Sequence, residues 1–544
     1  MKQSMLTKFS QTIWNDHVQL KQMFAQFLPT STMETDKKGS TPLQPNPLNS
    51  YSGRQKVGLI LGPLLFFLIL NFFHPEGMSK EALAVLASTT WIAIWWITEA
   101  IPIPATSLLP IILFPLTGAL DVGTTTSSYG NDVIFLFMGG FLIALTMERW
   151  NLHKRIALSI ISMIGTNMER LVFGFMLATA FLSMWISNTA TAMMMVPIGT
   201  AIVYKVKEAV SKENLASKTN DAETFAKALM LGIAYSASIG GLGTLIGTPP
   251  NALFAAVAGE LFDVTISFST WMLFGVPIAA LLLIGSWYYL TKIAFKMKLK
   301  NFPGGKEVIQ SELKSLGKLS FEEKIIFTVF LFTSIAWISR SFILSKWIPG
   351  INDTIIALIG AVILFAIPSK NKPGAFLLDW ETVKKLPWGI LLLFGGGLAI
   401  AAGFKETGLA QWIGEKMTLV SGIHFILILV VVTTIVIFLT EITSNTATAT
   451  MILPIMASLA SAIGVHPYAL MVASAIAASC AFMLPVATPP NAVVFGSNYL
   501  KIGDMAKAGF WLNVVSIIVI AFLIYLWMPI VWGIDIQHYP ADFK

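Results

Sequence analysis

Two identical polar hexapeptides lie inside apolar stretches of this sequence, and their residue types are suited to holding ions. Ser-Asn-Thr-Ala-Thr-Ala occupies residues 187–192 and recurs 257 positions later, at residues 444–449. Polar residues within a long apolar stretch are costly to bury and usually have a function. If each helix is interrupted there, free carbonyls and the Ser and Asn side chains supply hard oxygen ligands for a small cation such as Na⁺. The N–H groups that begin the following helix favour an anion.

A second repeated motif predicts two further helix breaks. Gly-Thr-Pro-Pro-Asn-Ala at residues 247–252 corresponds to Ala-Thr-Pro-Pro-Asn-Ala at residues 487–492, at an offset of 240. The double proline removes two N–H donors and disfavours a helical conformation at the preceding Thr. Small residues also line helix interfaces for packing alone, but four breaks that meet would form one anion site flanked by two cation sites. The motifs contain no Lys or Arg, so bound cations would neutralise the anion, which couples the two.

The two motif pairs belong to an internal duplication. The offset of 257 also places Pro197 on Pro454 and Ser183 on Thr440, which retains a hydroxyl. The polar segment 205–227 of the first half carries five lysines and four acidic residues. Its charge predicts a cytoplasmic loop, whereas the uncharged link after the second Ser-Asn-Thr predicts an external one. The two halves would then cross the membrane in opposite directions, and inverted repeats with interrupted helices are typical of secondary transporters.

The composition places these motifs in a membrane protein. Of the 544 residues, 55% are hydrophobic and 12% are charged, which is about half of the charged fraction of an ordinary soluble domain. A soluble enzyme, a disordered chain and a nucleic-acid-binding protein are therefore excluded. Cys480 is the only cysteine, so the chain has no internal disulfide and no cysteine metal cluster. The lack of a phosphate-binding loop argues against an ATP-driven pump.

Long apolar stretches predict the number of membrane crossings, because a transmembrane helix needs about 20 mostly apolar residues. Two shorter, Gly-rich apolar stretches, 133–145 and 388–402, are interpreted as re-entrant hairpins, which occur at membrane depth only inside protein or along a cavity. The sequence therefore predicts an all-α polytopic membrane protein with about 11 transmembrane helices, two re-entrant hairpins and an inverted repeat. The predicted crossings are 57–73, 82–101, 107–120, 171–204, 228–257, 271–291, 325–338, 355–367, 425–439, 451–463 and 509–532.

The distribution of charge predicts the orientation. Residues 1–56 are polar and lack the apolar core of a signal peptide, which favours a loosely ordered cytoplasmic tail. Residues 292–324 carry eight lysines and four acidic residues. By the positive-inside rule, the N-terminus and the 292–324 loop are cytoplasmic and the C-terminal tail, 533–544, is outside.

Glu441 is the acidic residue closest to a predicted break, because it directly follows Thr440. We interpret it as an ion-paired helix residue, with a cation ligand or a proton site as the alternative. No cluster of His, Asp, Glu and Cys accompanies the predicted breaks, which argues against a membrane-embedded enzyme.

The paired Ser-Asn-Thr motifs, the Thr-Pro-Pro segment that follows each, and the two Gly-rich stretches closely resemble the divalent anion:sodium symporter family. The resemblance is nearest to its bacterial sodium-coupled dicarboxylate transporters and extends from about residue 55 to residue 532. It implies a homodimer in which a scaffold forms the interface and a transport domain moves as an elevator. The implied scaffold comprises residues 57–128 and 263–380, and the implied transport domain comprises residues 129–262 and 381–532.

The resemblance also assigns roles to individual residues of the motifs. One sodium site is implied at Ser183, Ser187, Asn188 and Gly247. A second sodium site is implied at Thr440, Thr443, Asn445 and Ala487. The implied substrate-binding residues are Ser187, Asn188, Thr189, Thr248, Pro249, Ser444, Asn445, Thr446, Thr488 and Pro489.

The activity that the resemblance implies is Na⁺-coupled symport of C4-dicarboxylates such as succinate, malate and fumarate. Transport would run into a bacterial cell across its plasma membrane, with Na⁺ as the co-transported ion and no organic cofactor. The alternatives on the same fold are a Na⁺-independent dicarboxylate exchanger and a Na⁺-coupled transporter of citrate or sulfate. No basic residue replaces a cation-site residue, which favours symport. A passive channel is disfavoured because paired interrupted helices with two cation sites suit a site that closes around its cargo.

Overall fold

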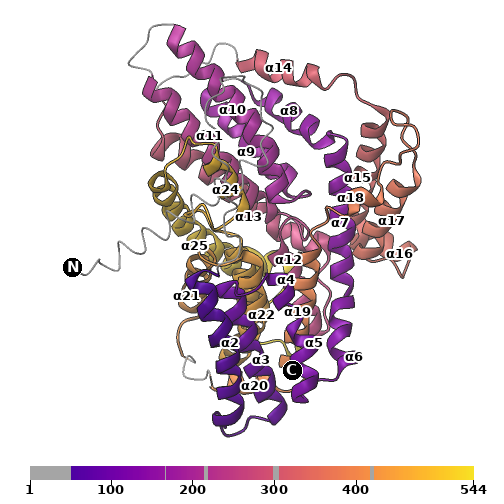
Figure 1. The fold of residues 1–544 in the computed structure, drawn as a ribbon, viewed down its shortest axis with the longest axis vertical. Coiled ribbons are helices and arrows are strands. Elements are labelled where there is room, and N and C mark those ends of the chain that lie inside the picture. Colours follow the sequence, from indigo (N-terminus) through magenta and orange to yellow (C-terminus); the bar gives the residue numbers. More distant parts are fainter. Residues whose placement is uncertain (1–50, 166, 213–218, 298–304, 417–421, 544) are drawn as a thin grey trace, which may run out of the picture.

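The computed structural model describes residues 51–165, 167–212, 219–297, 305–416 and 422–543, which form helices joined by short links (Figure 1). The one β feature within these ranges is an isolated bridge between Pro368 and Phe376. The all-α prediction is therefore confirmed for this part of the chain. The predicted N-terminal tail lies almost wholly outside the described residues, and α2 already begins at Gly53.

The first helices pack around α3, which contacts α2, α5 and α19. Ser52, Ser79 and Asn131 cap α2, α3 and α7, because each side chain accepts a hydrogen bond from an otherwise free N–H of the first turn. The helices are α2 (Gly53–Phe72), α3 (Lys80–Thr98), α4 (Ile103–Thr106), α5 (Leu109–Thr117), α6 (Val122–Ser127), α7 (Asp132–Arg149) and α8 (Leu152–Ile164).

Each half of the chain then supplies a helical pair, an interrupted helix and a closing helix. In the first half these are α9 (Met168–Ser183), α10 (Asn188–Lys212), α11 (Thr219–Gly241), α12 (Pro249–Phe262) and α13 (Phe268–Tyr288). In the second half they are α21 (Phe425–Thr440), α22 (Asn445–Ile463), α23 (Pro467–Ala478), α24 (Pro489–Gly496) and α25 (Ile502–Trp532).

The segment between the two sets carries the remaining helices, of which α15 and α17 pack on each other and on α7. A π-helical turn, η3 (Tyr289–Ala294), extends α13, and another, η4 (Arg340–Leu344), extends α15. The helices are α14 (Gly305–Ser315), α15 (Phe321–Ser339), α16 (Ser345–Trp347), α17 (Asp353–Ala366), α18 (Trp380–Val383), α19 (Trp388–Glu406) and α20 (Leu409–Lys416).

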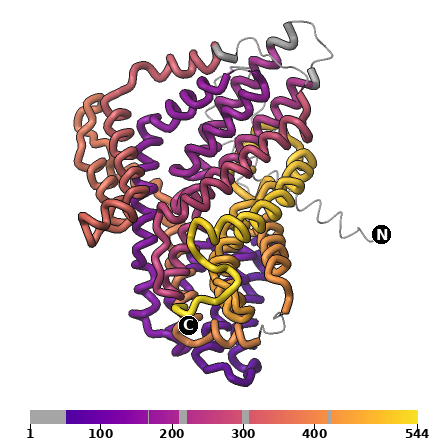
Figure 2. Tube along the Cα trace, turned by 180° about the vertical axis from the view of Figure 1, so that it is seen from behind, coloured from indigo at the N-terminus to yellow at the C-terminus, as the bar shows by residue number. Residues whose placement is uncertain are grey.

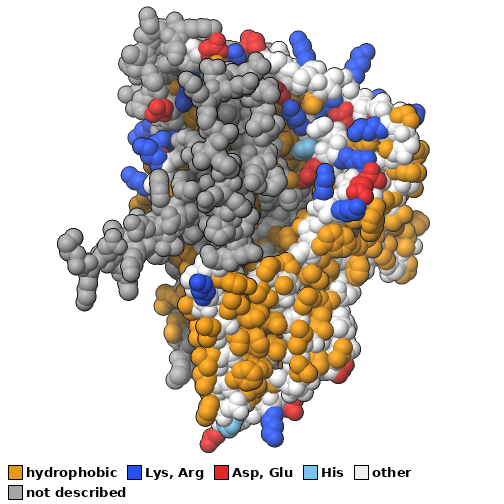
Figure 3. Space-filling model, viewed as in Figure 1, with side chains coloured by type: hydrophobic (Ala, Val, Ile, Leu, Met, Phe, Trp, Pro, Cys, Tyr) orange, Lys and Arg blue, Asp and Glu red, His pale blue; other side chains and the backbone are white. Residues whose placement is uncertain are grey.

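The surface is that of a multi-pass membrane protein. Within the described residues, nine helices are long and apolar enough to cross a membrane, and four shorter helical segments are also apolar. Large apolar side chains are exposed along them, including Ile60 (70%), Phe332 (68%) and Val362 (63%). Hydrophobic side chains cover broad areas of the face in Figure 3, and charged side chains gather toward its upper and lower ends. Such an apolar surface needs lipid around it. The predicted number of 11 crossings stays a prediction.

The predicted positions of the two re-entrant hairpins are wrong. Residues 133–145 and 388–402 lie within the continuous helices α7 and α19. The glycines of these helices serve close packing rather than a turn. Gly139 lies against the backbone of Ala357 on α17, and Gly396 lies against the carbonyl of Ser107, where a Cβ would come within 2.6 Å.

The hairpins are formed instead by α9 with α10 and by α21 with α22. In the first hairpin, Gly232 of α11 packs on Met176 of α9, and neighbouring Ile233 lies beside Gly199 of α10. The two arms therefore run side by side along α11 and meet at their tip. In the second hairpin both arms pack on α23 in the same way. The stretch 171–204 is thus a hairpin rather than the single crossing that its length predicted.

The two halves interlock around the helix breaks. After its interruption, the first broken helix continues as α12, which packs on α22 and α23 of the second half. The second continues as α24, which packs on α10 and α11 of the first half. At one end of the molecule lie α8, α10 and α14, and the C-terminus and α20 lie at the other (Figures 1 and 2). This exchange brings the break before α12 into contact with the break after α23, through Thr248 and Ser479.

Candidate functional site

The first Ser-Asn-Thr motif forms the turn between α9 and α10. Ser183 ends α9, and its Oγ lies 2.6 Å from the carbonyl oxygen of Ala237 on α11. Asn188 begins α10 and turns its amide toward the same point. One terminal atom of that amide lies 2.5 Å from Ser183 Oγ, 3.1 Å from Ala237 O and 3.3 Å from Gly247 O. A hydroxyl, an amide and two main-chain carbonyls thus converge. Of the implied first sodium site, Ser183, Asn188 and Gly247 meet here, whereas Ser187 Oγ accepts a hydrogen bond from the N–H of Ala190. The sodium site itself stays a prediction.

This donor set fits a small, hard cation. With its amide nitrogen turned inward, Asn188 donates hydrogen bonds to the surrounding oxygens. With its amide oxygen turned inward, the point is surrounded by oxygens and the Ser183 hydroxyl is the one donor among them. A Na⁺ ion satisfies such a cluster of neutral oxygens. Among the described residues, no group of three His, Cys, Asp or Glu side chains could hold a metal. A cation here would therefore be held by carbonyl, hydroxyl and amide oxygens.

Gly247 contributes a carbonyl because its backbone can touch Gly241. A Cβ at residue 247 would lie 2.4 Å from the carbonyl oxygen of Gly241, a distance that real side chains do not adopt. Asn251 fixes this loop, since its Nδ2 donates to Gly241 O at 3.0 Å and to Thr244 O at 2.8 Å. The sequence analysis gave Asn251 no role, although its recurrence in both Thr-Pro-Pro-Asn motifs was a usable signal.

The second Ser-Asn-Thr motif builds a related cluster. Thr440 Oγ1 lies 2.8 Å from Asn445 Oδ1 and 2.9 Å from the carbonyl oxygen of Ala478. The hydroxyl of Thr443 is engaged elsewhere, because it lies 2.6 Å from that of Thr448 and donates to the carbonyl four residues before it. Ala487 is buried in the loop between α23 and α24. Asn491 holds this loop by donating to two of its carbonyls, at 3.0 and 3.1 Å, as Asn251 does in the first half.

The residues predicted to hold an anion lie at helix N-termini. The six residues of the two Ser-Asn-Thr motifs are half-buried, whereas Ser183, Thr440 and Thr443, predicted to bind cations, are buried. Thr248 and Thr488 precede α12 and α24, whose first residues are Pro249 and Pro489. Thr248 Oγ1 also lies 3.2 Å from Ser479 Oγ, which joins the two interrupted helices across the halves. Free N–H groups and the positive ends of helix dipoles favour a negatively charged ligand.

Glu441 caps the main-chain N–H groups that the break in the second interrupted helix leaves free. Its buried carboxylate accepts hydrogen bonds from the main-chain N–H groups of Phe482 (2.8 Å), Met483 (2.9 Å) and Leu484 (3.1 Å) and from Nδ2 of Asn513 (2.7 Å). The expected ion pair is wrong, since within the described residues Glu441 meets no Lys or Arg. The interruption leaves N–H groups without helical partners, and one carboxylate can satisfy several of them. The sequence analysis missed Asn513, for which no local pattern gave a signal.

Comparisons with known proteins identify the family of this chain. Residues 55–534 match the family described as "Sodium:sulfate symporter transmembrane region". The chain is 52% identical to the sodium-dependent dicarboxylate transporter SdcS of Staphylococcus saprophyticus, over 91% of this chain and 95% of the relative. It is equally similar to SdcS of Staphylococcus aureus, with the same two coverages.

Two solved transporter structures share the fold at low sequence identity. MtrF of Neisseria gonorrhoeae aligns with a TM-score of 0.54 and 13% identity, covering 88% of this chain and 96% of that one. The YdaH transporter of Alcanivorax borkumensis aligns with a TM-score of 0.53 and 13% identity, covering 84% and 99%. The duplicated motifs, the interrupted helices that they form and the match over nearly the whole chain lead to one conclusion: the protein belongs to the sodium:sulfate symporter family, the divalent anion:sodium symporters that its motifs resemble.

Proposed function

We propose that this protein is a Na⁺-coupled symporter that carries C4-dicarboxylates such as succinate, malate and fumarate into the cell. The observation that carries the proposal is the pair of oxygen clusters at Asn188 and Asn445, each at the N-terminus of a helix that follows a break. The SdcS relatives, which are named sodium-dependent dicarboxylate transporters, support the same cargo. Na⁺ is a transported ion here, not a resident cofactor.

Coupling follows from the neutrality of the anion site. A dicarboxylate brings two negative charges to hydroxyls, amides and helix ends, and the Ser-Asn-Thr and Thr-Pro-Pro motifs contain no Lys or Arg. Bound Na⁺ supplies the missing positive charge and orders the same turns that hold the carboxylates. The affinity for the anion therefore depends on cation occupancy, and the dependence is reciprocal. Asn188 and Asn445 link the two events, because each begins a helix and also reaches a cation cluster.

The moving unit is proposed from the implied elevator, in which residues 129–262 and 381–532 travel against residues 57–128 and 263–380. The packing supports one refinement of these boundaries. Because α7 packs on α17 and α13 packs on α25, we assign α7 to the static part and α13 to the moving part. A disulfide between α7 and α17 should then leave uptake intact, whereas a disulfide between a hairpin and α15 should stop it.

We also propose that the N-terminus is cytoplasmic and the C-terminus is outside. The basis is the eight lysines between residues 292 and 324, a stretch that includes α14 at the end of the molecule opposite the C-terminus (Figure 1). Proteolysis of a tag on either terminus in sealed bacterial cells tests this orientation. Cleavage of a C-terminal tag by external protease supports it, and cleavage of an N-terminal tag reverses it.

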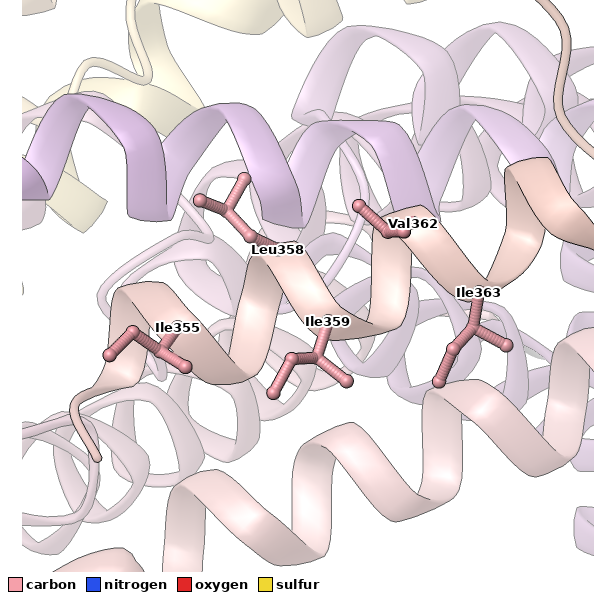
Figure 4. Close-up of a pocket in the computed structure, with 5 residues that line it drawn as sticks. All are labelled: Ile355, Leu358, Ile359, Val362 and Ile363. Atoms are coloured by element: carbon pink, nitrogen blue, oxygen red, sulfur yellow. The ribbon is translucent and has the colours of Figure 1, made fainter. Parts of the chain in front are cut away.

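The proposed homodimer uses the static helices. Figure 4 shows one apolar groove on α17, lined by Ile355, Leu358, Ile359, Val362 and Ile363. The lining has no polar group for a carboxylate, so this groove is not the anion site. A second copy would cover it, with lipid as the alternative occupant. A cysteine in place of Ile359, which is 51% exposed, should form a disulfide-linked dimer in membranes. A monomer alone would leave the face to lipid.

Uptake of radiolabelled succinate into proteoliposomes tests the function directly. We expect saturable uptake driven by an inward Na⁺ gradient and none when K⁺ replaces Na⁺. Uptake without Na⁺ that requires dicarboxylate inside the vesicles would instead identify an exchanger. Competition by unlabelled citrate or sulfate, at concentrations where malate and fumarate fail to compete, would move the assignment to the other cargo class.

A further inference from the structure

The tip of the first hairpin is anchored by an aromatic side chain. Trp185 lies in the turn between Ser183 and Ser187, and its side chain is 8% exposed. Its ring is nearly parallel to that of Trp337 (7°, centroids 6.4 Å apart) and to that of Phe268 (18°, 6.0 Å). The edge contact with Phe330 is at 88° and 5.2 Å. The turn that carries the first cation cluster is therefore inserted between α13 and α15.

Further contacts among its own residues hold the slot that receives Trp185 in this state. Phe268 and Trp337 stack directly, with centroids 4.5 Å apart. Nε1 of Trp337 donates to the carbonyl oxygen of Asp353, and the carboxylate of Asp353 accepts from the N–H of Phe268. Arg340 completes the set with an ion pair to Asp353 at 2.6 Å. In this state the start of α13, on the moving side, is thus joined to α17 and to the last turn of α15 around the indole.

The second hairpin has no such anchor. The residue that corresponds to Trp185 at the offset of 257 is Ile442, and its side chain is 59% exposed. The neighbouring loop shows the same contrast. Ile246, which packs on Gly140 of α7, is 6% exposed, whereas its counterpart Val486 at the offset of 240 is 61% exposed. In this state, the apolar residues at the tip of the first half are docked and those of the second half are free.

We propose that Trp185 is a positioning residue that latches the first Ser-Asn-Thr turn to α15 and biases the carrier toward the state described here. In the opposite state, the halves exchange environments: Trp185 and Ile246 leave their contacts, and Ile442 and Val486 become covered. The proposal rests on the proposed function, because a carrier must alternate between two states. Removing contacts that only one state makes is enough to shift the equilibrium toward the other state.

Cysteine accessibility reports the two states without any transport. The unmodified chain is the blank, since its single cysteine, Cys480, is fully buried. Two reporters are placed in turn, Val486→Cys on the free tip and Ile246→Cys on the docked tip, and labelling by a small maleimide is timed. Adding Trp185→Ala should slow labelling of the first reporter and speed labelling of the second. The expected change is about three- to tenfold, the range that one lost aromatic pair allows.

Opposite changes at the two reporters, restored by Trp185→Phe, support the latch. Equal rates with and without Trp185→Ala overturn it, as does faster labelling at both reporters, which would indicate loosening rather than a shift. Trp185→Phe behaving like Trp185→Ala also overturns it. If Trp185→Ala fails to reach the membrane, Phe330→Ala gives the same test from α15.

A double-mutant cycle separates the latch from a general packing defect. If Trp185 acts through its contact with α15, Trp185→Ala combined with Phe330→Ala should shift the reporters no further than either change alone. Additive shifts would show that the two residues act independently and would remove α15 from the proposal. Succinate uptake is measured alongside. Absent uptake with intact reporter shifts rejects the proposed cargo and keeps the latch, whereas normal Na⁺-dependent uptake without reporter shifts rejects the latch alone.

Discussion

In the first half of the site, the hydroxyl of Thr244 donates a hydrogen bond to the main-chain carbonyl of Met184. The corresponding residues of the second half are Leu484 and Glu441. There the loop residue again donates to the hairpin tip, but the side-chain and main-chain roles are exchanged: the main-chain N–H of Leu484 donates to the Glu441 carboxylate. Each bond ties a hairpin tip to the loop of an interrupted helix. The duplication has therefore kept a hydrogen bond at this position. Its side-chain partner has changed from a neutral hydroxyl donor on the loop to a buried carboxylate acceptor on the hairpin tip.

We expect this difference to make the two proposed cation clusters unequal. The first cluster consists of neutral oxygens in a loop closed by the contact of Gly241 with Gly247. The second includes Thr440, whose neighbour in the chain, Glu441, carries a buried carboxylate. A negative charge in a low-dielectric site strengthens the attraction of a cation. We therefore expect the second cluster to bind Na⁺ more tightly, and the predictions that follow test the two halves against each other.

The largest effect is expected from Asn188→Ala and Asn445→Ala. Each removes an amide that both begins a helix and reaches a cation cluster. Na⁺-dependent succinate uptake should fall to background in both variants, while size-exclusion profiles stay unchanged. Asn71→Ala is the control. It removes one exposed hydrogen bond, from the side-chain amide of Asn71 to the carbonyl of Phe67 on α2, and should transport normally. Normal uptake by either site variant would remove that half from the site.

Gly247→Ala should come next, because the added Cβ would collide with the carbonyl of Gly241. Overpacking of this kind typically costs about 1–3 kcal/mol, so Na⁺ affinity should fall by up to about a hundredfold. The matched change is Ala487→Gly, which gives the second loop the residue of the first and should alter the Na⁺ dependence of uptake little. Equal losses in both variants would show that the loss in Gly247→Ala does not come from the collision of its added Cβ.

Glu441→Gln should weaken Na⁺ binding by about tenfold, since hydrogen bonds to charged groups contribute about 1.5–3 kcal/mol and Gln keeps one of the two accepting oxygens. The measurement is the Na⁺ concentration that gives half-maximal uptake. Glu322→Gln is the control: that buried carboxylate also accepts main-chain N–H groups, those of Lys370 and Asn371. It should lower thermal stability without changing the Na⁺ dependence. A change in stability alone for Glu441→Gln would reduce this residue to a structural role.

The positions of all four helix breaks could be predicted from the sequence, because prolines and polar hexapeptides interrupt apolar helices by local chemistry. The location of the hairpins could not. A glycine-rich stretch is compatible with a turn or with a helix that another chain segment approaches closely, and only tertiary packing distinguishes them. The contact of Gly396 with Ser107 joins positions nearly 300 residues apart.

The role of Glu441 shows the same limit. The sequence places an acid next to Thr440, and a partner of opposite charge is the usual expectation for a buried acid. The actual partners are the main-chain N–H groups at Phe482 and its two successors. Main-chain groups leave no signature in residue type, so no reading of side chains alone could find them.

The smallest effect is expected from Thr244→Val, which removes the neutral tie and keeps the shape of the side chain. A single neutral hydrogen bond contributes about 0.5–1.5 kcal/mol, so half-maximal uptake should shift by about threefold in Na⁺ concentration. The comparison with Glu441→Gln is the decisive one. If both variants shift the Na⁺ dependence equally, the charge of Glu441 adds nothing to the tie, and the two cation sites differ only in backbone shape. If Thr244→Val has the smaller effect, the duplication has given its two cation sites different strengths, and the acid of the second half accounts for the difference.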